Sequence, residues 1–174
     1  MMNAIIWPAG YLPGLSDNFV SNEVIIHDLP IAAVWHLLCH PAEWPGYYGN
    51  AADPSFDKGA GPGFSLGDRF RFTTFGFPVE AQITEYVPPV PGLAGRLAWH
   101  GWAGERGTPT RLDVHHAWLV EAMPQNRLRI LTQETQNGAP ARQLATTHPN
   151  PMLNGHQDWL DGLVAAARSW RQHG

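Results

Sequence analysis

A histidine and a glutamate on neighbouring predicted strands are the residues best suited to proton transfer. Alternation along residues 112–121 assigns His116 to the inner face, and alternation along residues 128–136 places Glu134 on an apolar face. A buried carboxyl beside a histidine suits acid–base chemistry, because burial raises a carboxyl pKa and a carboxylate raises that of histidine. The pair is therefore either catalytic, with His116 and Glu134 as acid and base, or a structural ion pair at the strand end.

The same alternation divides the 112–121 strand into two faces. The inner set is Leu112, Val114, His116, Trp118 and Val120. The outer set is Asp113, His115, Ala117, Leu119 and Glu121, and we expect it to face solvent. A slip of one residue at His115-His116 would exchange the two histidines.

His156 is a third candidate polar group, on the helix expected near the C-terminus. It lies four residues after Met152 and four before Leu160, and so shares their apolar face. It is either a polar group over a ligand cavity or a histidine of ordinary structural role. In the second case it lies in the core, bonded to a backbone carbonyl, or at the surface.

Aromatic residues are numerous, with 8 Trp, 7 Phe and 4 Tyr in 174 residues. They either stack against a flat ligand or fill the core. The residues expected to contact a ligand are Trp44, Tyr48, Phe72, Trp99, His116, Trp118, Glu134, His156 and Trp159.

Other motifs lack the context that their chemistry needs. His36 and His40 have the spacing of a helical metal pair, but no third ligand is evident, so we expect no metal. Ser65 lies in a Gly-x-Ser-x-Gly match that follows a Gly/Pro-rich loop and precedes a strand, which argues against a nucleophile. The glycines of residues 59–63 lack the end of a phosphate loop, and no cofactor is expected.

The elements that position these residues follow from periodicity and breakers. Strands are expected at 21–27, 68–75, 78–87, 96–102, 112–121 and 128–136, helices at 30–40, 42–44 and 150–172, a loop at 47–67, and a broken apolar stretch at 140–147. Asp28 is the expected cap of the first helix, and Asn150 of the last. The order predicts an α+β fold in which a curved antiparallel sheet wraps around a long C-terminal helix.

Length and composition limit the class of protein. The chain is expected to form one domain over residues 20–174, with an irregular arm over residues 1–19 packed on it. A net charge of −4 without a basic run argues against nucleic-acid binding. The single cysteine, Cys39, excludes an internal disulfide, and no apolar run approaches a membrane span. The N-terminus lacks the basic segment of a signal peptide, so we expect a cytoplasmic protein.

Three stretches resemble the SRPBCC (START-like, helix-grip) superfamily, in particular its polyketide cyclase/dehydrase and lipid-transport branch. The first stretch comprises Val24-Ile25-Ile26 and residues 29–35 and 41–45. The second comprises Leu66 to Phe72 and Ile83 to Pro88. The third comprises Leu131 to Gly138 and Gly155 to Leu163. The resemblance covers residues 20–172. It implies a helix-grip fold, with two short helices after the first strand and a deep cavity whose mouth lies near Trp44, Tyr47 and Tyr48. A shared fold does not carry a shared reaction.

Three functions follow as hypotheses. The first is a binding protein that holds a small hydrophobic molecule, aromatic or lipid-like, in the cavity. The second is a cyclase or dehydratase on a polyketide-like substrate, in which His116 and Glu134 move protons. The third is a protein-interaction adaptor whose cavity is filled. The sequence also leaves room for a homodimer through a sheet edge or an aromatic loop.

Overall fold

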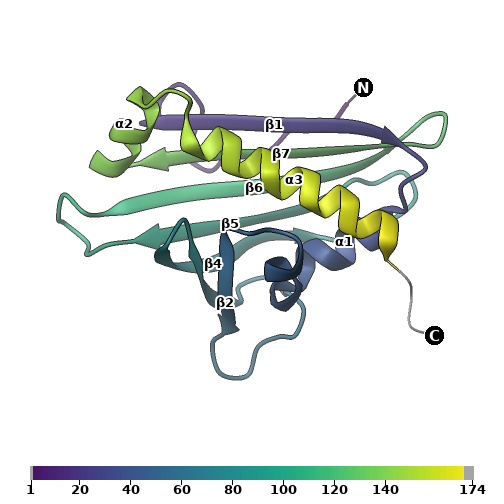
Figure 1. The fold of residues 1–174 in the computed structure, drawn as a ribbon, viewed down its shortest axis with the longest axis horizontal. Helices are drawn as coiled ribbons and strands as arrows, with labels where there is room; N and C mark the ends of the chain where they lie inside the picture. The colour runs from purple at the N-terminus through teal and green to yellow at the C-terminus, as the bar shows by residue number, and fades with distance from the viewer. Residues whose placement is uncertain (1, 171–174) are drawn as a thin grey trace.

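The computed structural model describes residues 2–170, and its main feature is one antiparallel sheet of seven strands (Figure 1). The strand order across the sheet is β1-β7-β6-β5-β4-β3-β2. The elements are β1 (Asn18–His27), α1 (Ile31–Cys39), the 3₁₀ helix η1 (Pro41–Gly46), β2 (Ala51–Phe56), β3 (Arg69–Thr74), β4 (Phe77–Val87), β5 (Gly95–Ala103), β6 (Leu112–Met123), β7 (Arg127–Asn137), α2 (Ala139–Thr146) and α3 (Pro151–Ser169). No helix in the described residues is long and apolar enough to cross a membrane.

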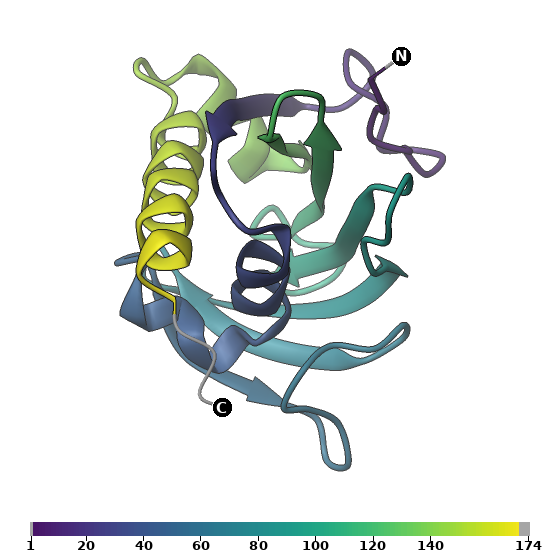
Figure 2. The same ribbon diagram turned by 90° about the vertical axis from the view of Figure 1, so that its right-hand side faces the viewer.

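The sheet curves around α3, which lies along its inner face (Figure 2). Phe70 and Phe72 of β3 are buried on that face, as the alternation predicts. The β6–β7 pair keeps one continuous register, in which His116 lies opposite Glu134. The two histidines of β6 are therefore not exchanged, and the predicted α+β architecture is confirmed.

The first helix begins differently from the prediction. α1 starts after Pro30 with no side-chain cap. Asp28 has a φ of 57° and accepts a hydrogen bond from the Asn126 side chain on the β6–β7 turn. The prediction that Asp28 caps the helix is wrong, because its carboxylate is bonded to that turn instead. α1 ends at Cys39, and after His40 the chain enters η1 at Pro41, where a short helix was expected.

The long helix begins as predicted. The Asn150 side chain accepts a hydrogen bond from the Met152 amide at 3.0 Å, and Pro151 occupies the first turn, where its missing N–H is tolerated. α3 ends at Ser169. Gln172, where the helix was expected to end, lies outside the described residues.

Two segments expected to be irregular are ordered. β2 lies within the expected loop at 47–67 and pairs with β3 across a register shift between Ala52 and Ser55. The sequence of β2 shows little alternation of apolar and polar residues. The strand is recognised from its pairing with β3. α2 lies in the expected broken stretch at 140–147, and Ala141 is its one buried residue. A short helix with so small an apolar face leaves a weak periodic pattern.

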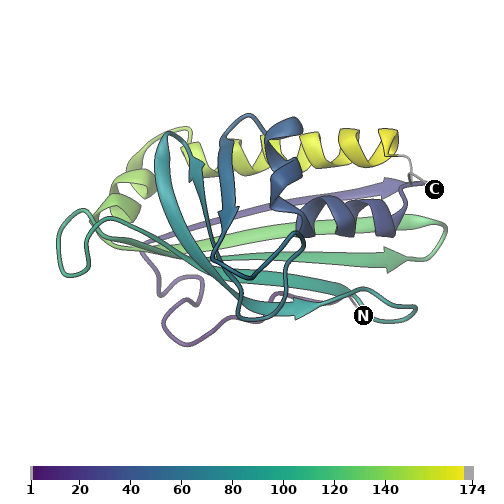
Figure 3. The same ribbon diagram turned by 90° about the horizontal axis from the view of Figure 1, so that it is seen from below.

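The outer face of the central strands is covered rather than exposed. Residues 2–17 contain no helix or strand and cross the face opposite α3 (Figure 3). Ile5 packs with Ala117 and Leu119, and Trp7 lies edge-on to His115 with ring centroids 5.5 Å apart. The prediction that this face meets solvent is therefore wrong. Alternation identifies two faces, but it does not show whether a distant segment covers the outer one.

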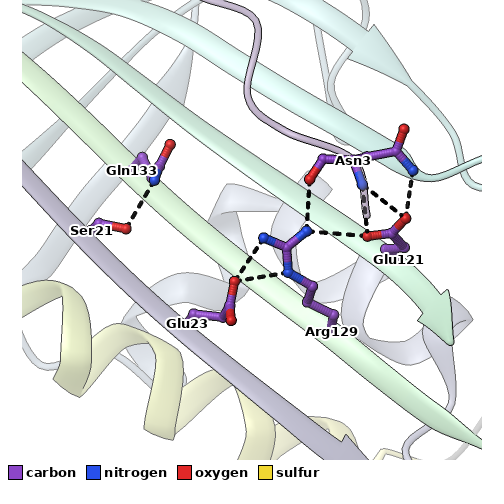
Figure 4. A network of polar contacts seen from close by, with 6 residues as sticks. All are labelled: Asn3, Ser21, Glu23, Glu121, Arg129 and Gln133. Carbon is purple, nitrogen blue, oxygen red and sulfur yellow. Dashed lines mark hydrogen bonds and ion pairs between the residues drawn. The ribbon is translucent and has the colours of Figure 1, made fainter. Parts of the chain in front are cut away.

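A polar network holds the start of this arm against the sheet (Figure 4). The buried Arg129 of β7 contacts Glu23 at 2.7 Å and Glu121 at 3.2 Å, and donates to the Asn3 carbonyl at 2.7 Å. The Asn3 backbone and side-chain amides in turn donate to Glu121. A buried guanidinium needs acceptors for its N–H groups, and the arm supplies one of them.

Candidate functional site

A cavity of about 490 Å³ lies between the inner face of the sheet and helices α2 and α3. Small-molecule sites usually measure roughly 300–1,000 Å³. Its apolar wall includes Phe72 from β3, Val79 from β4, Leu112 and Val114 from β6, Leu144 from α2 and Met152 from α3. The sheet therefore does not close completely onto its helices.

Most of the expected ligand-contact residues line this cavity. They are Tyr48, Phe72, Trp99, His116, Glu134, His156 and Trp159. Trp44 and Trp118 are not among the lining residues, because they pack behind Trp159, with ring centroids 5.0 Å and 5.4 Å from it. These two tryptophans support the wall rather than form it.

Three buried polar side chains meet at one wall of the cavity. His116 and Glu134 face each other across β6 and β7, with His116 Nδ1 3.1 Å from Glu134 Oε2. His156, from the second turn of α3, places its Nε2 3.5 Å from the same oxygen. The two imidazole rings stack with centroids 4.5 Å apart. We call these three residues the polar cluster.

Hydrogen bonds account for nearly every polar atom of the cluster. Gln136 donates to Glu134 Oε1 at 2.5 Å, and His116 Nε2 lies 2.8 Å from the Thr132 hydroxyl. An ionised carboxylate only accepts, so neutral His116 carries its proton on Nδ1, and Nε2 accepts from Thr132. Both nitrogens of His116 are thus engaged within the protein. The Nδ1 of His156 has no hydrogen-bond partner in the described part of the chain.

Burial and charge set the protonation of the cluster. Burial lowers the pKa of His116 to about 4, and positive charge on His156 acts in the same direction. Burial alone would raise the pKa of Glu134, but the charge of His156 and the hydrogen bonds of both imidazoles lower it below its usual value. From the sequence we expect both pKa values to rise, and both expected directions are wrong. At neutral pH Glu134 is ionised and His116 is neutral.

Two groups of histidine and acidic side chains bring potential metal-ligand atoms together in the described residues. They are His116, Glu134 and His156, and His36, His40 and Glu43. Glu43, 2.7 Å from His36, is the third group that the sequence did not reveal. The imidazole rings are stacked in both groups, with planes 23° apart for His116 and His156 and 24° apart for His36 and His40. Within each group, imidazole nitrogens contact the carboxylate at 2.7–3.5 Å.

Ser65 and the single cysteine, Cys39, both lie in unreactive settings. Ser65 is followed by β3, and its backbone amide donates to Asp68 at 2.7 Å. No helix follows this serine, so the nucleophile context is missing. Burial raises the pKa of Cys39 to about 12, which keeps the thiol protonated.

Several cavity residues were not expected from the sequence. Gln136 shares the parity of Glu134 along β7, so the same alternation could have identified it. Leu144 enters through α2, which was not predicted, and Phe75 lines the cavity from the β3–β4 turn with a φ of 49°. No local pattern indicates that such a turn residue reaches α3.

Comparisons with known proteins establish the relationships of the chain. No protein-family model and no curated sequence matches it. The solved structure of hypothetical protein jhp0584 from Helicobacter pylori is 47% identical, with a TM-score of 0.91, over 97% of this chain and 98% of that one.

More distant structures share the fold alone. DynU16, from the dynemicin biosynthetic locus, is 14% identical with a TM-score of 0.57, over 89% of this chain and 51% of that one. Norcoclaurine synthase from Thalictrum flavum is 11% identical with a TM-score of 0.58, over 90% and 95%. The chain therefore belongs to the same family as hypothetical protein jhp0584 from Helicobacter pylori, and it has the helix-grip fold.

Proposed function

We propose that this protein binds a small hydrophobic molecule, aromatic or lipid-like, in the cavity between the sheet and α3. The observation that carries the proposal is an apolar cavity of about 490 Å³ with one buried polar cluster in its wall. Apolar walls with a few convergent polar groups are the usual form of small-molecule sites.

The wall behind the cavity is tightly packed, which supports a preformed site. Trp159 of α3 stacks on Tyr48 with ring centroids 4.5 Å apart and planes 11° apart. Trp44 lies edge-on to Trp159, with ring centroids 5.0 Å apart, and is fully buried. Such interlocked rings resist collapse into the empty volume. The cavity is thus not filled by side chains, and this argues against the adaptor hypothesis.

The binding test is a fluorescence titration with N-phenyl-1-naphthylamine, an uncharged apolar probe. Trp99 and Trp159 line the cavity, so an occupant should quench their emission. Val114→Trp should fill the cavity and weaken binding at least tenfold. The matched control is Leu93→Trp, at an exposed position outside the cavity, which should bind like the parent. Equal binding by both variants would count against the cavity as the site.

An enzyme is the second candidate, because a buried carboxylate–histidine cluster faces a ligand cavity. The fold is shared with norcoclaurine synthase and with DynU16 of a biosynthetic locus, which supports the hypothesis at the level of fold only. His116→Ala or Glu134→Gln should then reduce turnover of a substrate more than its affinity. A binding protein would instead keep its ligand response in His116→Ala.

A further inference from the structure

A second group of histidine and acidic side chains lies outside the cavity, where helix α1 leads into η1. His36 is in the last turn of α1, His40 is its C-cap residue, and Glu43 is in the first turn of η1. The Glu43 amide donates to the His40 carbonyl at 2.9 Å, which turns the chain back toward α1. The potential ligand atoms of the three side chains lie within 4.8 Å of one another. None of the three residues lines the cavity, so ligand binding there assigns them no role.

The hydrogen bond of His40 determines which of its ring nitrogens carries a lone pair. Its Nδ1 lies 2.8 Å from the His36 carbonyl oxygen, which only accepts, so Nδ1 carries a proton. In the neutral imidazole the lone pair is therefore on Nε2. Metal-binding histidines commonly donate their other ring N–H to a backbone carbonyl, which sets both the tautomer and the orientation of the ring. His40 thus offers Nε2 as a ligand atom.

The loop before β3 packs against the His40 ring and leaves this nitrogen uncovered. The Phe64 amide donates to the Cys39 carbonyl at 2.9 Å, which holds the loop at the end of α1. A Cβ added at Gly63 would lie only 3.0 Å from His40 Nε2. Glycine therefore leaves room at Nε2 that any other residue would reduce. The contacts with the loop and with the His36 carbonyl make His40 the fixed member of the group.

His36 and Glu43 are paired with each other and accessible to an ion from solvent. Nε2 of His36 lies 2.7 Å from Glu43 Oε1, and the two side chains are 36% and 41% exposed. The His36 ring stacks on that of His40, with centroids 4.0 Å apart. An ion shared by all three residues requires His36 to rotate out of this stack. The rotation exchanges the His36–Glu43 hydrogen bond for a bond from each side chain to the same ion.

Two imidazole nitrogens and one carboxylate oxygen form a ligand set that suits Zn²⁺. Imidazole favours Zn²⁺, Cu²⁺ and Ni²⁺, whereas Mg²⁺ and Ca²⁺ prefer oxygen ligands. Zn²⁺ has no geometric preference from its d electrons, and a site with three protein ligands leaves a fourth position for water. The C-terminal end of α1 also favours a cation, because its last carbonyl groups carry partial negative charge.

We propose that His36, His40 and Glu43 bind a divalent transition-metal ion of the Zn²⁺ class at the end of α1. No third ligand is evident from the sequence, and Glu43 supplies it through the turn into η1. The ion joins α1 to η1 and, through the Phe64–Cys39 hydrogen bond, to the loop before β3. It binds the folded chain, in which the three residues meet, and therefore stabilises that state. The site is separate from the cavity and does not depend on the ligand proposed for it.

Calorimetric titration with ZnCl₂ at pH 7.5 tests the site on tag-free protein that has been treated with EDTA and freed of it. One Zn²⁺ should bind per chain. His40→Gln and Glu43→Gln should each weaken binding by about tenfold or more, since the loss of even an outer-shell partner costs about that much. His27→Gln, at an exposed histidine on β1, is the matched control and should bind Zn²⁺ like the parent.

Gly63→Ala tests the site with all three ligands in place. Its methyl group would lie close to His40 Nε2, so the affinity for Zn²⁺ should fall. Thermal unfolding in EDTA reports whether each variant still folds. Added Zn²⁺ should raise the melting temperature of the parent and of His27→Gln more than that of His40→Gln.

Two results would refute the site. One is a parent protein that binds no Zn²⁺, and the other is equal affinity in the parent, His40→Gln and Glu43→Gln. Saturating Zn²⁺ should also leave the affinity for N-phenyl-1-naphthylamine unchanged. An ion that displaces this probe would lie at the polar cluster in the cavity instead, which would equally overturn the assignment to α1 and η1.

Discussion

At the residue scale, His115 and His116 show how two adjacent, chemically identical side chains acquire different partners. His116 faces the polar cluster, and His115 faces Trp7 and Tyr11 of the arm. The pKa of each histidine is lowered to about 4, and burial is the largest cause in both. Both therefore remain neutral in the folded protein at neutral pH, and neither accepts a proton without loss of stability.

The first prediction concerns acid stability. An ordinary histidine has a pKa of 6.5, against about 4 for folded His116, so the unfolded chain binds the proton first as pH falls. The stabilisation is complete above pH 6.5 and is lost between pH 6.5 and 4. It amounts to about 3 kcal/mol at 1.4 kcal/mol per pKa unit. His116→Gln should remove this contribution to the loss of stability as pH falls.

Urea unfolding at pH 7.5 and at pH 4.5 measures that effect. The free energy of unfolding should fall less in His116→Gln than in the parent between the two values. His115 still contributes a loss of the same sign, so the variant keeps a residual slope. An identical fall in parent and variant would contradict the assigned pKa direction.

At the element scale, the position of α3 depends on a close approach to the chain after η1. A Cβ at Gly162 would lie 1.9 Å from the Tyr47 carbonyl oxygen. Gly162→Ala should therefore destabilise the fold by about 1–3 kcal/mol through overpacking, although alanine favours helices by about 1 kcal/mol. Asn154→Ala, exposed on the same helix, should be neutral or slightly stabilising. Thermal unfolding of the two variants separates these outcomes, and a Gly162→Ala protein as stable as the parent would contradict the close contact.

The N-terminal arm is the second element that can be tested. Ile5 is 8% exposed and packs on the outer face of the sheet, whereas the adjacent Ile6 is 64% exposed. Ile5→Ala should cost about 2 kcal/mol or more, as buried isoleucines do, and Ile6→Ala less than about 0.5 kcal/mol. The comparison is made by urea unfolding. Equal costs would mean that the arm does not pack on the sheet in solution.

At the scale of the whole molecule, the cavity links the stability of the fold to ligand binding. A ligand at 100 times its dissociation constant stabilises the folded state by about 2.7 kcal/mol. For a protein of this size that corresponds to a rise of about 5–10 °C in melting temperature. The parent should show this rise with saturating N-phenyl-1-naphthylamine. Val114→Trp should not, and differential scanning calorimetry compares the two.

The sequence by itself determined the order of elements and the inner faces of the central strands. Alternation placed Phe72, His116 and Glu134 inward, and the breakers Asn150 and Pro151 marked the start of α3. These features are local, since strand parity and helix caps depend on neighbouring residues. That local information sufficed to predict six of the seven strands, the long helix and the His116–Glu134 contact.

Only the tertiary structure decided what meets across long sequence separations. The contact of His156 with Glu134, the cover that Ile5 gives the outer face, and the entry of Leu144 into the cavity join distant segments. The pKa directions depend on them too, because burial on every side of the cluster and charge from α3 act together. A local pattern records which face a side chain occupies. The segment that packs against that face is selected by burial and hydrogen bonding over the whole chain.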